Sequence, residues 1–223
     1  MHPPLAASVW VGHEHNMERY RSKIDTLKDA LVGMEHRPPS SDFDLNKDYL
    51  TPKNMKFRNA AVLIPITLGP SGLEVIFTKR SQSMRNHPGQ ISFPGGKQDP
   101  TDTSFIHTAL REAEEEIGLR QSDVSVIGAL PKHKTVTSFL VHPVVGLVPP
   151  SFVPRVLTNE VSEVFTAPLS HLINPGNYLI EGRFWQGHKR HYFTIPYGPY
   201  YIWGATARML RMLTEIMEKS HAP

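Results

Sequence analysis

Apolar residues recur at two different spacings along the chain, and the spacings predict which segments are helices and which are strands. Steps of three and four residues predict an amphipathic helix over residues 17–31 and a packing helix over residues 204–219. Between them, short stretches rich in β-branched and aromatic residues predict strands. These strands cover residues 60–68, 73–78, 91–93, 124–130, 135–148, 161–165 and 190–195. The interspersed order predicts a mixed α+β fold with one core.

Breaks between these segments set the predicted boundaries. A turn at residues 69–72 joins the first two strands into a hairpin, and a third helix follows Asp102 and ends before Gly118. Residues 1–13 are predicted to be a disordered arm, and the polar, proline-bearing stretch 35–54 a linker. The predicted organisation is therefore an N-terminal arm with one helix and a linker (residues 1–54), followed by one domain (residues 55–223).

Composition narrows the classes of function. The chain has 223 residues, 39% of them hydrophobic, which fits a single globular domain. It has no cysteine, which excludes thiolate metal sites and cysteine nucleophiles. A net charge of +3 favours phosphorylated small molecules and is weak evidence for nucleic-acid binding. No apolar run is long enough for a membrane span, and no targeting pattern is evident. We expect an intracellular protein, with the cytoplasm favoured and mitochondria and peroxisomes left open.

The third helix gathers three carboxylates on one face. With about 100° per residue, Glu115 and Glu116 lie roughly 60° and 40° to either side of Glu112. The neighbouring face is apolar and is predicted to be buried: Ile106, Ala109, Leu110, Ala113 and Ile117. Such a row of like charges is either a solvated acidic surface or an oxygen-ligand site for a hard divalent cation. The nearby Pro94-Gly95-Gly96 loop, and Arg111 beside the glutamates, favour the site.

Residues 96–119 resemble the signature box of the Nudix hydrolases. Arg111, Glu112, Ala113, Glu115, Glu116, Gly118 and Leu119 match its second half. The first half departs from the pattern, because Asp102 replaces a glutamate and eight residues, not seven, separate it from Arg111. We predict that Asp102 serves as the helix N-cap.

The resemblance implies a fold, a reaction and a set of residues. The fold is an α/β/α sandwich around a mixed β-sheet, and the reaction is hydrolysis of a nucleoside diphosphate linked to another group. Glu112, Glu115 and Glu116 would bind Mg²⁺ or Mn²⁺, with the Gly96 carbonyl as a further ligand and Arg111 fixing the glutamates. A box glutamate, or the later Glu160 or Glu163, would act as general base.

A longer resemblance, over about residues 58–212, is to the coenzyme A diphosphatase branch of this family. It rests on Arg80-Ser81, on Arg85-x-His87-x-Gly89, on Phe93-Pro94-Gly95-Gly96 and on Trp203-Gly204-x-Thr206-Ala207. It implies that CoA and acyl-CoA esters give 3′,5′-ADP and (acyl-)4′-phosphopantetheine. Arg80, Arg85, His87, Gly95 and Gly96 would bind the substrate. The apolar segments at residues 144–148 and 184–185 are expected in the core, not in a pantetheine groove.

Two other readings stay open at this point. The enzyme could be a broader dinucleotide diphosphatase that acts on NADH, ADP-ribose or CoA-capped RNA. It could also be a non-catalytic binding module, although all three box glutamates are present. A Nudix-fold isomerase is disfavoured because its usual form needs a cysteine. The oligomeric state is not predicted.

Overall fold

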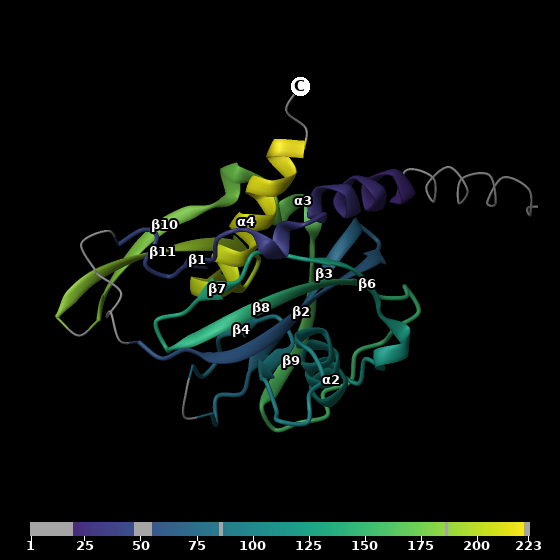
Figure 1. Ribbon diagram of the computed structural model, residues 1–223, viewed down its shortest axis with the longest axis horizontal. Coiled ribbons are helices and arrows are strands. Elements are labelled where there is room, and N and C mark those ends of the chain that lie inside the picture. The colour runs from purple at the N-terminus through teal and green to yellow at the C-terminus, as the bar shows by residue number, and fades with distance from the viewer. Residues whose placement is uncertain (1–19, 47–54, 85–86, 186, 221–223) are drawn as a thin grey trace, which may run out of the picture.

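A computed structural model describes residues 20–46, 55–84, 87–185 and 187–220 (Figure 1). Its main sheet has nine strands of mixed direction. The long strand β2 (Arg58–Gly69) pairs in parallel with β8 (Phe139–Leu147) and antiparallel with β3 (Gly72–Arg80). The other strands pair around these three: β1 (Ser40–Ser41), β4 (Ile91–Ser92), β5 (Gly95–Lys97), β6 (Ser125–Ala129), β7 (His133–Lys134) and β9 (Val161–Pro168).

A second, antiparallel sheet of three strands lies beside the first. It contains β10 (Leu179–Trp185), β11 (His188–Tyr197) and β12 (Tyr200–Trp203), which leads directly into α4 (Gly204–Ser220). The remaining short elements are α3 (Leu169–Leu172) and the 3-10 turns η1 (Met34–His36), η2 (Gln121–Asp123) and η3 (Pro175–Asn177).

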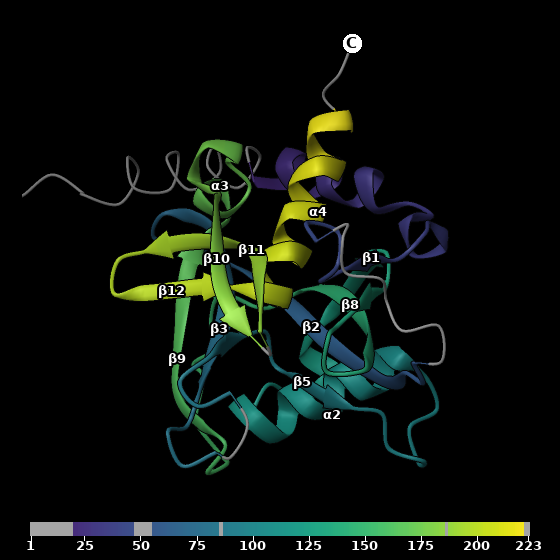
Figure 2. The same cartoon turned by 90° about the vertical axis from the view of Figure 1, so that its left-hand side faces the viewer.

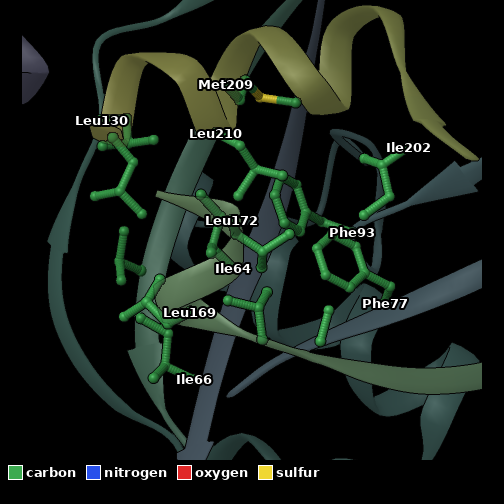
Figure 3. Packing of buried hydrophobic residues seen from close by; sticks show 14 of the residues in the cluster. Ile64, Ile66, Phe77, Phe93, Leu130, Leu169, Leu172, Ile202, Met209 and Leu210 are labelled. Atoms are coloured by element: carbon green, nitrogen blue, oxygen red, sulfur yellow. The ribbon is translucent and has the colours of Figure 1, made fainter. Parts of the chain in front are cut away.

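Helices cover the two faces of the main sheet. Helix α2 (Phe105–Ile117) lies on one face, and α4, α3 and the helix over residues 20–31 lie on the other (Figures 1 and 2). Each face has its own apolar cluster. Ala109, Ala113 and Ile117 of α2 pack against Leu63 of β2. The larger cluster on the opposite face includes Phe77, Phe93 and Leu210 (Figure 3).

The predicted mixed α/β/α sandwich is therefore confirmed. Burial of each fully covered Leu, Ile or Phe side chain contributes roughly 1.5–3 kcal/mol, so these two clusters supply the main stabilisation of the fold.

The N-terminal region packs against the domain along most of its described length. Leu27 and Leu31 of the first helix are buried in the larger cluster. The stretch predicted to be a linker contains β1, which pairs in parallel with β7. Asp42 then forms an ion pair with the buried His133, with 3.0 Å between Oδ1 and Nε2. Up to residue 46 this stretch is thus a built part of the fold. The predicted arm, residues 1–13, and residues 47–54 lie outside the described residues.

Most predicted elements are confirmed, and the errors have clear physical causes. The strand predicted over residues 135–148 is β8, but its predicted start was wrong, because residues 135–138 form the turn between β7 and β8. Ile106 was predicted to be buried and is 45% exposed. Phe184 was predicted to be in the core and is 74% exposed, on a strand outside the main sheet, whereas Val144 and Val145 are buried as predicted. Among the described residues, no helix has the length and apolar character needed to cross a membrane.

Candidate active site

Helix α2 is fixed at both ends by its own sequence. Ser104 is the N-cap, and its side chain accepts a hydrogen bond from the His107 backbone N–H at 3.0 Å. Gly118 ends the helix with φ 72°, a left-handed conformation that glycine adopts without steric cost. The prediction that Asp102 caps the helix was wrong, because Ser104 takes that position.

Asp102 instead holds Arg111. Its carboxylate accepts hydrogen bonds from Arg111 Nε at 2.9 Å and Nη2 at 3.0 Å, and from the Asp99 backbone N–H at 2.9 Å. The Asp102 side chain is fully buried. The Arg111 hydrogen bonds hold the pKa of Asp102 well below its usual range. The residue that departs from the family pattern is therefore a carboxylate that positions Arg111.

Arg111 in turn contacts two of the box glutamates. Its Nη2 lies 3.0 Å from Glu112 Oε1, and its Nη1 lies 3.0 Å from Glu115 Oε2. The hydrogen bonds from Arg111 to Asp102 raise the pKa of the guanidinium, and the charge of Glu112 adds to this effect. Arg111 is thus a fixed positive centre that orients Glu112 and Glu115.

Glu116 is the most buried of the three glutamates. Burial and, to a smaller extent, the nearby charge of Glu112 raise its pKa to about 8, while the Gly95 backbone N–H donates to Glu116 Oε2 at 3.4 Å. Burial also raises the pKa of Glu112. Both charged carboxylates are thus disfavoured by burial and by a neighbouring glutamate, Glu112 in the case of Glu116 and Glu115 in the case of Glu112, and a cation would stabilise such an arrangement.

Two glycines let strand β5 lie close to helix α2, which carries these carboxylates (Figure 2). A Cβ on Gly96 would lie 2.5 Å from the carboxyl carbon of Glu112. A Cβ on Gly95 would lie 2.5 Å from the backbone oxygen of Ala61 in β2, with which β5 pairs. The segment predicted as a loop is therefore a short strand, and its glycines let it pair closely with β2 on one side and contact the Glu112 carboxylate on the other.

The oxygens of the three box glutamates are the kind of ligand that a hard divalent cation prefers, but their side chains do not all point to one position. In the described part of the chain, no three His, Asp or Glu side chains stand close enough together to hold an ion. Glu112 and Glu116 lie one turn apart on α2, close enough that the charge of Glu112 raises the pKa of Glu116. Glu115 is 54% exposed and is held by Arg111. A three-glutamate site would thus require the Glu115 side chain to turn from Arg111 toward the other two.

The predicted substrate residues are placed unequally. Arg80, at the end of β3, is close enough that its charge lowers the pKa of Glu116. It also forms an ion pair of 3.6 Å with Glu160. His87 is exposed, with φ 55°, in the loop between β3 and β4. Arg85 lies outside the described residues.

The two later glutamates differ as candidate bases. Glu163 accepts hydrogen bonds from Tyr200 Oη at 2.5 Å and from Lys79 Nζ at 3.2 Å, and both lower its pKa. Glu160 is more than half exposed, and its charge raises the pKa of Glu116, so it faces the carboxylate site. Sequence reasoning missed Tyr200, since nothing in its spacing connects β12 with β9.

Comparison with known proteins agrees with this geometry. The family model described as the NUDIX domain matches residues 57–185, which is more than half of the chain. The chain belongs to the Nudix hydrolase family. Nudix hydrolases act on pyrophosphate bonds and generally use divalent metal ions such as Mg²⁺ or Mn²⁺.

Two curated relatives of this Nudix hydrolase are similar over most of their length. The uncharacterized Nudix hydrolase NudL of Escherichia coli strain CFT073 is 41% identical over 186 residues, covering 81% of this chain and 96% of that protein. NudL of Salmonella dublin is 42% identical over 174 residues, covering 78% and 90%. Among solved structures, the MutT protein of Methanosarcina mazei is 17% identical and covers 77% of this chain and 100% of its own, with a TM-score of 0.49. Structural similarity at that level adds nothing to the assignment.

Proposed function

We propose that this Nudix hydrolase cleaves the diphosphate bond of coenzyme A and of acyl-CoA esters, giving 3′,5′-ADP and (acyl-)4′-phosphopantetheine. The observation that carries the proposal is the position of Arg80. Its guanidinium is near enough to Glu116 to lower that residue's pKa, at the start of the loop that also bears Arg85 and His87. CoA has a 3′-phosphate in addition to its diphosphate, and an arginine at the rim of the site supplies charge for it.

The proposed roles of the glutamates follow from their environments. Glu112, Glu115 and Glu116, with the Gly96 carbonyl, would hold Mg²⁺ or Mn²⁺. The cation would neutralise the diphosphate oxygens and acidify a water for attack on phosphorus. Asp102 fixes Arg111, and Arg111 orients Glu112 and Glu115. Gly96 leaves room for the Glu112 carboxylate beside β5, and the backbone of Gly95 and Gly96 would contact the diphosphate.

The proton of the attacking water needs an acceptor. Glu160 supports this role better than Glu163, because Tyr200 and Lys79 stabilise the charged form of Glu163 and make it a weaker base. The Glu160 side chain is more than half exposed, and among the described side chains its only ion-pair partner is Arg80. Glu160→Gln should lower kcat strongly, whereas Glu163→Gln should lower it little.

A substrate comparison tests the proposal. Hydrolysis of CoA, dephospho-CoA, NADH and ADP-ribose is measured with Mg²⁺ or Mn²⁺, and the products are identified. CoA should be cleaved with a clearly higher kcat/KM than dephospho-CoA. Equal rates on the two would exclude recognition of the 3′-phosphate and would favour the broader dinucleotide diphosphatase.

One variant separates substrate recognition from a general loss of charge. Arg80→Ala should lower kcat/KM for CoA by about tenfold more than for dephospho-CoA, because a charge-assisted contact contributes roughly 1.5–3 kcal/mol. Arg120→Ala is the matched control, since Arg120 is an exposed arginine paired with Asp123 beyond the end of α2. An equal loss on both substrates would show that Arg80 does not contact the 3′-phosphate.

A further inference from the structure

Strand β10 is an exposed edge with apolar side chains on both of its faces. Among the residues that the structure describes, it pairs only with β11, and the hairpin that the two form projects from the body of the molecule (Figure 1). Ile180 is 58% exposed and Phe184 is 74% exposed, both on one face of the strand, while Leu179 is exposed on the other. Natural edge strands usually carry lysine, proline or a bulge that prevents pairing. Strand β10 has no lysine or proline, and its pairing with β11 has no register shift.

The outer backbone groups of β10 can be identified from its neighbour. Asn46 binds both backbone groups of His191: it accepts from the His191 N–H at 2.7 Å and donates to its C=O at 2.9 Å. His191 therefore does not bond across to Gly182, its partner in the register. In an antiparallel ladder such non-bonded pairs alternate with bonded ones. Ile180, Gly182 and Phe184 thus direct their N–H and C=O groups outward, away from β11.

The sequence of this strand is complementary to itself when it is reversed. It reads Leu179-Ile-Glu-Gly-Arg-Phe-Trp185, with Gly182 in the middle. An antiparallel pair of two such strands about Gly182 sets Glu181 opposite Arg183 of the partner copy, and Ile180 opposite Phe184 of the partner copy. Each pair occurs twice because the arrangement has a two-fold axis. Facing residues lie on the same side of the sheet, so opposite charges meet on one face and apolar side chains on the other.

We infer that two copies of this chain associate through β10, joining their three-stranded sheets into one continuous sheet of six strands with the two-fold axis at Gly182. The three outward residues of each copy exchange backbone hydrogen bonds with those of the other. The occupant is a second copy, not an unrelated strand, because the order of charges and apolar residues in β10 matches its own reverse. In the single chain Tyr201 of β12 donates to Glu181 Oε2 at 2.6 Å, so in the dimer this carboxylate exchanges Tyr201 for Arg183 of the other copy.

A charge exchange tests the pairing in the full-length protein. The mass in solution is measured by light scattering and sedimentation velocity, from low to high micromolar concentration. Wild type should reach twice the mass of one chain. Glu181→Arg and Arg183→Glu each place like charges opposite one another at two positions, and each should weaken the dimer roughly tenfold or more. The double variant E181R/R183E restores opposite charges and should restore the dimer.

Lys189→Glu is the matched control for these variants. It makes a comparable charge change on the adjacent strand β11, where Lys189 faces Phe184 of its own chain and no charged residue of the other copy. It should leave the dimer unchanged. A single-chain mass for wild type at every concentration would overturn the proposal. So would a dimer that both single reversals leave intact, or one that the double variant fails to restore.

The register can be tested separately, because the chain has no cysteine. Gly182→Cys places the new thiol opposite its own copy, with about 5.5 Å between Cα atoms, which a disulfide can span. Its Cβ would lie 2.6 Å from Cε of the flexible Lys189 side chain and 3.3 Å from the His191 ring. Under mild oxidation Gly182→Cys should form a covalent dimer rapidly, whereas Lys189→Cys should not. In the proposed dimer the two copies of Lys189 are three strand spacings, about 14 Å or more, apart. Equal rates for the two variants would refute the register.

Discussion

The buried Asp102 is predicted to contribute more to stability than any other partner of Arg111. Its carboxylate accepts two hydrogen bonds from the guanidinium and one from the Asp99 backbone, with no solvent exposure of the side chain. Breaking a buried pair by removing one partner typically costs about 3–5 kcal/mol. Arg111 keeps Glu112 and Glu115 as partners, so Asp102→Ala should lie at the low end, about 3 kcal/mol.

Glu115 provides the matched comparison, because it contacts the same guanidinium from the surface. It is 54% exposed, and exposed ion pairs contribute about 0–1 kcal/mol. Glu115→Ala should therefore cost less than about 1 kcal/mol. Both variants keep Arg111, so the difference between them isolates burial and hydrogen bonding at Asp102.

Urea unfolding followed by circular dichroism measures both costs. The midpoint should fall strongly for Asp102→Ala with an unchanged m-value, and slightly for Glu115→Ala. In thermal unfolding the larger cost corresponds to a fall in Tm of roughly 6–12 °C. Equal losses in the two variants would refute the reasoning, because the position that departs from the family pattern would then have no special structural role.

Three further results follow from the geometry. Gly96→Ala should lower kcat/KM at least about tenfold with little loss of stability, because its Cβ would displace the Glu112 carboxylate. Gly95→Ala should instead destabilise the fold by about 1–3 kcal/mol in urea unfolding, because its Cβ meets the backbone of β2. Asp42→Asn tests a pH dependence. Burial acts to raise the pKa of Asp42, but the hydrogen bond from His133 and the positive charge of His133 outweigh burial. The pKa of Asp42 is therefore held below 3.8. A lowered pKa stabilises the fold above that pH. The difference in free energy of unfolding between wild type and Asp42→Asn should therefore be largest near neutral pH and shrink as the pH falls below about 4. A difference that does not change with pH would contradict this.

The sequence predicted α2 and its carboxylate face well because local signals agree there. Apolar residues recur at helical spacing, and Gly118 stops the helix in a left-handed conformation. The N-terminal end was less predictable. Both Asp102 and Ser104 are good N-cap residues, and only the position of Arg111 shows which one is free to cap. Competition of this kind is decided by tertiary contacts.

The sequence did not predict strands β5 and β10, because neither has the residue pattern typical of a strand. Strand β5 contains Gly95 and Gly96, whose sequence predicts a break in the chain. They nevertheless pair with β2, at positions where only glycine leaves enough room. Strand β10 has no alternation between buried and exposed positions, since both of its faces are exposed. Phe184 was therefore taken for a core residue on hydrophobicity alone. The contact of Tyr200 with Glu163 joins strands far apart in sequence, and no local pattern encodes it.

The central claim is that the box glutamates carry out metal-dependent cleavage of a CoA diphosphate. The most direct test is Mg²⁺- or Mn²⁺-dependent hydrolysis of CoA by wild type and by Glu116→Gln, with products identified and thermal stability measured in parallel. Wild type should release 3′,5′-ADP and 4′-phosphopantetheine, and Glu116→Gln should show no turnover while it remains folded. Turnover near the wild-type rate in folded Glu116→Gln would contradict the assignment.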